Sequence, residues 1–493
     1  MTALLRRLIA LFLCLTIMLP ASAAGEGARP AGSRVEQKLS LREYLQKSYL
    51  GLFELAPTLE YTQAEIDSQR EALKKGKDLC VDRFENHMKR YGKQIDAVRK
   101  DLKNNTATLT EVQRKEIHCN IQNLDLLKSE AEVLANQAIP TAYDNLKAKL
   151  DLIQQWPLHY KQIQNEIASG SYHTRRWGDV KDIGFRQIEP NQEDDIRRGA
   201  QAVREMKRLG LMPPPVEDKA IQEYVRSVAE RVARNSDLKV PLHIEVLQSR
   251  EINAFALPGG YLFIERGLLE AVDDESQLAG VIAHEIAHDT ARHSYKMVKR
   301  ATIASLFYQA AQIAAVVLTG GVAGIGIYYA LQYGFYGLGL VLDLKLLGVS
   351  RDYELQADQL GVQYAWKAGY DPTGFIRFFD KMATKKGYVN SVSWFRTHPP
   401  FYQRMVQAQR EIMFLERKPN VIMQTSAFEQ MKRDLGPVAA KAEKEEIGKP
   451  SLLMTKEEGC ESPKTLEYKP DRRIEELCSS LAPTQQNARQ EKE

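Results

Sequence analysis

Two histidines and a glutamate stand together in the stretch VIAHEIAHDT, residues 281–290. On a helix, His284 and His288 lie one turn apart on the same face, so their ring nitrogens can share one tetrahedral metal ion. Glu285 lies beside the pair, where it can take a proton from water without binding the metal. Buried without a metal, these polar groups would cost several kcal/mol. The pattern therefore predicts a zinc site rather than a chance arrangement on an amphipathic helix.

A tetrahedral site needs a third protein ligand. A site completed by a third histidine close in sequence would have glycine at 291 and histidine at 294, but the chain has Ala291 and Ser294, and His293 is one position away. The stretch SRDYELQAD offers Glu354 and Asp358 instead, four apart on one helical face. Glu354 would complete a His2Glu site with one position left for water. Asp358 would accept a hydrogen bond from the far nitrogen of a ligand histidine. The alternative is a solvated acidic face.

These motifs occur in an order that is known from one protein family. NAFALPGG (253–260) precedes the HExxH stretch, and the ExxxD pair and THPPFYQR (397–404) follow it. In this order they resemble the M48 family of zinc metalloendopeptidases, over about residues 190–415. Within that family, the chain is similar to the exported bacterial branch that acts in protein quality control in the cell envelope.

The resemblance implies a fold class and a set of roles. The fold would be mainly α (α+β), a gluzincin-like zinc peptidase domain with a small twisted sheet whose edge strand receives the peptide. One Zn²⁺ per chain would be held by His284, His288 and Glu354. Glu285 would be the general base, and Asp358 would lie behind the ligands and orient one of the histidines.

The THPPFYQR motif lies close to the metal in this family. Pro399 and Pro400 fix the backbone around His398. We expect His398 either to donate to the developing oxyanion or to occupy the open zinc position as a latency plug. Arg404 would either stabilise the tetrahedral intermediate or support the loop. The alternatives are a structural histidine and a structural ion pair.

The elements around the motifs can be predicted from periodicity. Amphipathic helices are expected at about 192–209 and 217–235, followed by a half-buried strand in VPLHIEVLQS. Two short strands near 253–257 and 261–265 flank Pro-Gly-Gly and form a hairpin. An extended substrate would pair with one of these strands, which makes Asn253, Ala254 and Phe255 candidate substrate-binding residues. Asp274 is the expected N-cap of the HExxH helix, and Gln277 is in the reciprocal capping-box position.

The region before this domain is polar and helix-favouring. Residues 38–175 predict a long helix, a break at KNNTATLT (103–110), a second helix at 111–137 and a third after Pro140. This is a helical hairpin or small bundle. The peptidase-like domain would span 180–432, and a charged tail would span 433–493.

Composition limits the compartment and the partners. A chain of 493 residues predicts two or three domains, and a net charge of +4 gives no reason to expect nucleic-acid binding. Residues 1–24 contain two arginines, an apolar run and then small residues, which predicts a cleaved secretory signal before a linker at 25–37. The alternative is an uncleaved anchor. We expect an exported, periplasmic protein.

Four cysteines follow the signal, and an even number in an exported chain predicts two disulfides. They are Cys80, Cys119, Cys460 and Cys478. All three pairings remain open. Cys460–Cys478 is the local choice, whereas Cys80 and Cys119 would not be level in a straight hairpin. The alternative is free buried thiols.

Residues 301–342 carry no charge and join the histidine-bearing helix to the Glu354 helix. A transmembrane hairpin, a flap that covers the cleft and touches a membrane surface, and an oligomer interface are the three alternatives.

The predicted function is hydrolysis of internal peptide bonds in misfolded or unassembled envelope proteins, by a chain that could form homo-oligomers and associate with the membrane. The alternative is an envelope chaperone or assembly scaffold with a latent protease site. A purely structural zinc site is disfavoured by Glu285 and by the open fourth position.

Overall fold

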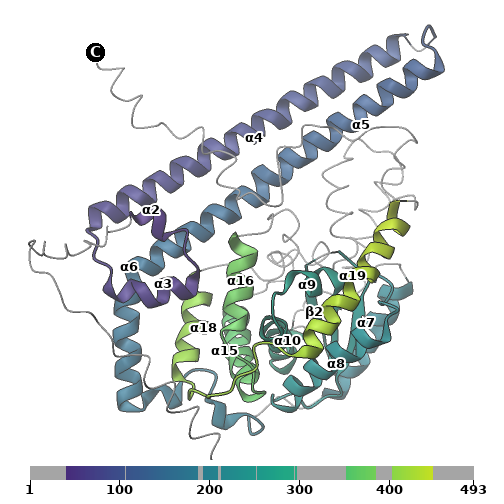
Figure 1. The fold of residues 1–493 in the computed structure, drawn as a ribbon. Coiled ribbons are helices and arrows are strands. Elements are labelled where there is room, and N and C mark those ends of the chain that lie inside the picture. Colours follow the sequence, from purple (N-terminus) through teal and green to yellow (C-terminus); the bar gives the residue numbers. More distant parts are fainter. Residues whose placement is uncertain are drawn as a thin grey trace, which may run out of the picture. The chain divides into compact units, whose positions relative to one another are not determined.

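The computed structural model describes residues 40–105, 107–186, 192–208, 212–250, 252–293, 295–296, 351–384 and 402–447. Apart from Ser40, these residues belong to one compact unit, Leu41–Glu493. The described part is predominantly helical and contains a three-stranded sheet (Figure 1), which confirms the predicted fold class. Several predictions fall outside the described residues: the signal and linker, the stretch 301–342, His398, Cys460 and Cys478.

The predicted N-terminal hairpin is present. Helices α4 (Gln63–Asn105) and α5 (Glu111–Val133) run side by side and are joined at the expected break (Figure 1). An ion pair between Arg99 and Asp125, with Nη2 and Oδ2 3.4 Å apart, links them. Few residues of α4 are buried, so this pair of helices has a largely polar surface.

The third predicted helix is not separate from the second. A π-helical turn at Leu134–Ala138 carries α5 directly into α6 (Ile139–Ser169). Pro140 therefore lies inside a continuous helical run, where it has no N–H to donate to the preceding turn. The wider turn before it shifts the hydrogen-bond pattern by one residue and lets the helical run continue. Sequence periodicity alone gives no sign of such a turn.

The register of this run separates the two described cysteines. Lys77 of α4 pairs with Asp144 of α6, at 3.5 Å between Nζ and Oδ1, which places Cys80 level with the residues around Asp144. Cys119 lies about 25 residues earlier on the same run, or roughly 37 Å along the helix axis. Disulfides join Cα atoms about 4–7 Å apart. Both sulfurs take part in disulfide bonds, but the register excludes a bond between them.

The N-terminal helices pack directly on the helices that surround the site. Trp156 of α6 is buried, and its Nε1 donates to the carbonyl of Phe53 in α3 (Tyr49–Leu55) at 2.9 Å. Lys149 of α6 is fully buried and pairs with Asp380 of α16 (Gly374–Thr384) at 3.1 Å. Helix α6 also packs on α18 (Tyr402–Phe414). The hairpin is thus anchored to the peptidase-like region through α6.

The small sheet follows the predicted pattern. Strands β1 (His243–Leu247), β2 (Ala254–Leu257) and β3 (Tyr261–Glu265) lie in the order β1-β3-β2. β1 is parallel to β3, and β2 is antiparallel to it. Gly259 and Gly260 have φ of 85° and 86°, which only glycine adopts readily and which the tight β2–β3 turn requires. The expected helices are α7 (Gln192–Arg208) and α8 (Lys219–Arg234).

Two further helices pack near the sheet and α8. α9 (Arg266–Ala271) follows β3 directly, and α19 (Ser426–Ile447) packs on α8 and α9. α19 extends past the predicted start of the tail at 433, and its Leu435 is buried. Within the described ranges, no helix combines the length and apolar character needed to cross a membrane.

Candidate metal centre

The histidine pair lies on α10 (Glu275–Thr290), which is buried along almost its whole length. Asp274 is the N-cap, as predicted, and accepts from the backbone N–H of Gln277 at 3.0 Å. The Gln277 side chain accepts from the N–H of Asp273 at 3.1 Å, one residue before the expected partner. Arg377 of α16 reaches Asp274 and Ser276, at 3.3 and 2.7 Å. These contacts fix where the helix begins.

The glutamate lies on α15 (Arg351–Lys367), which packs closely against α10. The two helices meet at Gly361. A Cβ atom added there would lie 3.0 Å from both the backbone N and the Cα of His284. Glycine therefore permits the approach that brings Glu354 opposite the histidine pair.

Three ligand atoms converge in this buried space. The Nε2 atoms of His284 and His288 are 3.0 Å apart, and the carboxylate of Glu354 lies 3.6 and 3.4 Å from them. One ligand atom from each residue lies within 4.8 Å of the others. All three side chains are less than a tenth exposed. Two imidazole nitrogens and a carboxylate that converge away from bulk water form a donor set that suits a divalent metal such as zinc.

Asp358 stands behind His284, as predicted. Its Oδ1 lies 3.0 Å from Nδ1 of His284, on the side of the ring away from the cluster. Burial opposes ionisation of Asp358, but the Arg404 guanidinium and His284 outweigh it and hold its pKa below the usual range. An ionised Asp358 keeps the Nδ1 hydrogen in place and leaves Nε2 for the metal.

Arg404 of α18 is fully buried behind the same cluster. Its Nε and Nη2 each donate to Asp358 at 2.7 Å, and its Nη1 lies 3.0 Å from Glu354. The guanidinium is thus shared by two carboxylates, one on a candidate ligand and one behind a ligand. This arrangement favours the supporting role predicted for Arg404 over direct contact with a reaction intermediate.

Three residues that were not predicted as site residues complete the surroundings of His288: His293, Gln356 and Tyr353. His293 Nδ1 lies 3.0 Å from Nδ1 of His288, and its Nε2 lies 3.1 Å from Oε1 of Gln356. The His293 ring stacks on Tyr353 at 4.3 Å. Burial lowers the pKa of His293 to about 4. In the sequence His293 served only to exclude one class of site, because nothing indicated that the chain turns back after α10.

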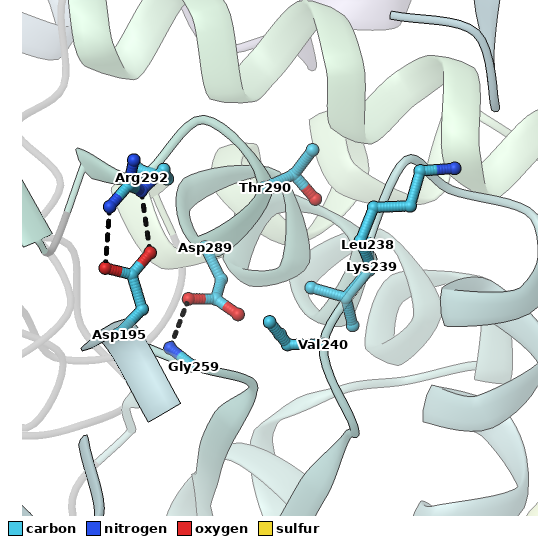
Figure 2. Close-up of a pocket in the computed structure, with 8 residues that line it drawn as sticks. All are labelled: Asp195, Leu238, Lys239, Val240, Gly259, Asp289, Thr290 and Arg292. Carbon is cyan, nitrogen blue, oxygen red and sulfur yellow. Dashed lines mark hydrogen bonds and ion pairs between the residues drawn. The ribbon is translucent and has the colours of Figure 1, made fainter. Parts of the chain in front are cut away.

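The turn is made at Arg292, the one non-glycine residue with positive φ (56°) among those described. This left-handed conformation costs a residue with a Cβ about 1 kcal/mol. The Asp195 carboxylate on α7 holds this turn: it accepts two hydrogen bonds from the Arg292 guanidinium, at 2.6 and 2.8 Å (Figure 2). Next to this pair, Asp289 accepts from the N–H of Gly259 at 3.2 Å, which ties the end of α10 to the β2–β3 turn (Figure 2).

The remaining predicted site residues lie on α10 and at the edge of the sheet. Glu285 is buried on α10, next to His284. Asn253 is buried just before β2, and its carbonyl accepts from the N–H of Glu265 at 3.0 Å. Phe255 stacks on Phe263 at 5.0 Å in a cluster with α7 residues, so its ring serves packing. A role of Asn253 and of the β2 backbone in substrate binding stays a prediction.

Comparison with known proteins agrees with this geometry. Residues 219–412 match Peptidase family M48. The chain is 26% identical over 246 residues to the Beta-barrel assembly-enhancing protease of Yersinia pestis, covering 49% of this chain and 48% of that protein. It is 27% identical over 229 residues to the protein of the same name in Escherichia coli K12, covering 45% of each. With the mitochondrial metalloendopeptidase OMA1 of Schizosaccharomyces pombe it shares 32% over 188 residues, 37% of this chain and 50% of that one.

The chain spans about half the length of the curated relatives it matches. The matched region includes both helices that supply the candidate ligands, as well as Arg404. Residues 219–412 are therefore a metallopeptidase domain of family M48.

Proposed function

We propose that this chain is an exported zinc endopeptidase that cleaves internal peptide bonds of misfolded or unassembled envelope proteins. The observation that carries the proposal is the buried convergence of His284, His288 and Glu354, all within 4.8 Å. A zinc ion bound there would polarise the scissile carbonyl and acidify the attacking water.

The protein's own residues then have distinct tasks. Glu285, adjacent to His284 on α10, accepts a proton from the attacking water and delivers it to the leaving amine nitrogen. Asp358 holds His284 through Nδ1, and Arg404 keeps the Asp358 and Glu354 carboxylates in place. The substrate lies extended along the sheet edge formed by β2, so binding depends on its backbone more than on its side chains.

The substrate class is supported by two observations. The relatives from Yersinia pestis and Escherichia coli are named as proteases that enhance β-barrel assembly. Residues 1–24 have the pattern of a secretory signal. A chain with both features would act in the periplasm, on envelope proteins that fail to fold or assemble.

Export also accounts for the cysteines. Cys80 and Cys119 take part in disulfides and cannot reach each other, so we propose that they pair with Cys460 and Cys478, which would tie the tail to the helical hairpin. Such bonds persist in oxidising compartments. Mass spectrometry of unreduced peptides tests this: a linked Cys80–Cys119 or Cys460–Cys478 peptide would contradict it.

A chaperone or assembly scaffold is the second candidate function. It is favoured by the α4–α5 hairpin, which lies outside the matched region 219–412. Glu285→Gln separates the two functions, because it removes the base and keeps the three ligands. The protease proposal expects this variant to retain zinc, lose casein cleavage and fail to complement a deletion strain. Full complementation by this variant would instead support the scaffold.

Contact of residues 301–342 with a membrane surface and assembly into homo-oligomers both remain predictions. Flotation of the purified protein with lipid vesicles tests the first, and light scattering of the protein in solution tests the second.

A further inference from the structure

We propose that His293 is a positioning residue for His288: it accepts the Nδ1 hydrogen of His288 and thereby fixes the tautomer that directs Nε2 toward the metal. This inference rests on the proposed metal centre and names a residue that the domain's ligand set does not include.

The direction of the hydrogen bonds follows from the distances. His288 Nε2 faces the cluster, 3.4 Å from Glu354 and 3.0 Å from His284 Nε2, so Nε2 is the ligating atom. A neutral imidazole that ligates through Nε2 carries its hydrogen on Nδ1. That Nδ1 lies 3.0 Å from Nδ1 of His293, which must therefore accept.

The contact between His293 and Gln356 is consistent with the same hydrogen positions. A neutral His293 that accepts at Nδ1 carries its hydrogen on Nε2. This atom lies 3.1 Å from Oε1 of Gln356, an amide oxygen that can only accept. The chain from His288 through His293 to Gln356 therefore has one consistent arrangement of hydrogens when His288 binds a metal.

The backbone is built to place His293 there. In a continued α-helix, a residue five positions after His288 would point about 140° away from it. The left-handed turn at Arg292 (φ 56°) brings His293 back instead. Asp195 holds this turn through two hydrogen bonds to Arg292, as Figure 2 shows. An unfavourable backbone conformation that is fixed by a buried ion pair beside a reactive centre is typical of functional sites.

Helix α15 thus supports both histidines by different means. Asp358 lies behind His284 as a carboxylate, whereas Gln356 acts on His288 through the neutral ring of His293. Tyr353, on the same helix, stacks on the His293 ring and limits its rotation away from His288. Removing His293 should therefore affect metal binding more than it affects the fold.

The test compares substitutions at 293 in purified full-length protein. His293→Phe keeps an aromatic ring to stack on Tyr353 but has no acceptor. His293→Asn places an amide oxygen near the former Nδ1. Zinc affinity is measured by competition with a chelator, and the visible spectrum of the cobalt-substituted protein reports ligand geometry. His243→Phe on the surface-exposed start of β1 is the matched control.

We expect His293→Phe to bind zinc about 10- to 100-fold more weakly, the effect typical of losing a group that orients a ligand. Its cobalt spectrum should change while the melting temperature of its metal-free form stays near that of wild type. His293→Asn should recover most of the affinity. Gln356→Leu, a milder change at a half-buried position, should weaken zinc binding several-fold. Gln356→Glu keeps an acceptor and should leave zinc binding unchanged.

The inference would be overturned if His293→Phe bound zinc as tightly as wild type, or if His293→Asn lost as much zinc affinity as His293→Phe. It would also be overturned if metal-free His293→Phe failed to fold and Gln356→Leu had no effect on zinc affinity. A wild-type protein that binds no metal would instead contradict the proposed function. The two failures are therefore distinguishable.

Discussion

Asp358 Oδ1 lies 3.0 Å from Nδ1 of His284, although the two residues come from different helices and are far apart in the chain. The helix that supplies the third candidate ligand, Glu354, therefore also orients the first. Because both functions depend on the same crossing of α10 and α15, a change in that crossing should alter metal binding before it alters overall folding.

Replacing the orienting carboxylate should weaken the metal site. Asp358→Asn keeps the shape of the side chain but removes the charge that holds the His284 tautomer, so zinc affinity should fall about 10- to 100-fold. The control is Asp352→Asn, an exposed position on the same helix that pairs with Arg176. Isothermal titration with zinc should show wild-type affinity for the control. Equal affinities in both variants would contradict the role given to Asp358.

Removing the shared guanidinium should destabilise the metal-free protein most. Arg404→Met leaves the Asp358 and Glu354 carboxylates buried without their cation, which should cost roughly 3–5 kcal/mol in the free energy of unfolding. Zinc neutralises part of that charge and should reduce the loss. Urea denaturation with chelator and with zinc measures both values. Arg410→Met, which breaks a partly exposed pair with Glu166, should cost at most about 1 kcal/mol.

The close approach of the two helices can be tested at one glycine. A methyl group at 361 would press on the backbone of His284 at 3.0 Å. Gly361→Ala should push α15 away and lower zinc affinity and peptide cleavage together, even though alanine favours helix. Gly436→Ala in α19, where an added Cβ meets nothing within 4 Å, is the control. Unchanged zinc affinity in Gly361→Ala would mean that this contact does not set the spacing.

Stability should fall in acid partly through Asp371, which contacts the start of α16. It accepts from Thr373 N–H at 2.9 Å and from Arg377 at 2.8 Å. Burial opposes its ionisation, but Arg377 and Thr373 outweigh burial and lower its pKa. The unfolded chain therefore binds this proton more tightly. The stabilisation is complete above the ordinary aspartate pKa of about 3.9 and is lost as pH falls through the lower folded value.

Asp371→Asn removes the ionisable carboxyl and with it this pH-dependent stabilisation. The difference in the free energy of unfolding between wild type and variant should be largest near pH 7 and should narrow below pH 4. Denaturation curves across that range measure it. A difference that stays constant with pH would show that Asp371 stabilises by packing alone.

The sequence predicted the parts of the site that lie on single helices. His284, His288, Glu354 and Asp358 could be identified because spacings of four place side chains on one face. The two-helix crossing, the partners of Arg404 and the contact between His293 and His288 could not. They depend on approaches between distant segments and on a left-handed residue, Arg292, that no local preference indicates. The same limit explains why Pro140 was expected to end a helix that a π-turn lets continue.

Metal content of matched variants tests the central claim most directly. Elemental analysis after gel filtration should find one zinc per chain in wild type and in Glu285→Gln, and almost none in His284→Ala or Glu354→Ala. Only wild type should cleave a peptide substrate. Equal zinc in wild type and Glu354→Ala, or cleavage that persists in Glu285→Gln, would contradict the account.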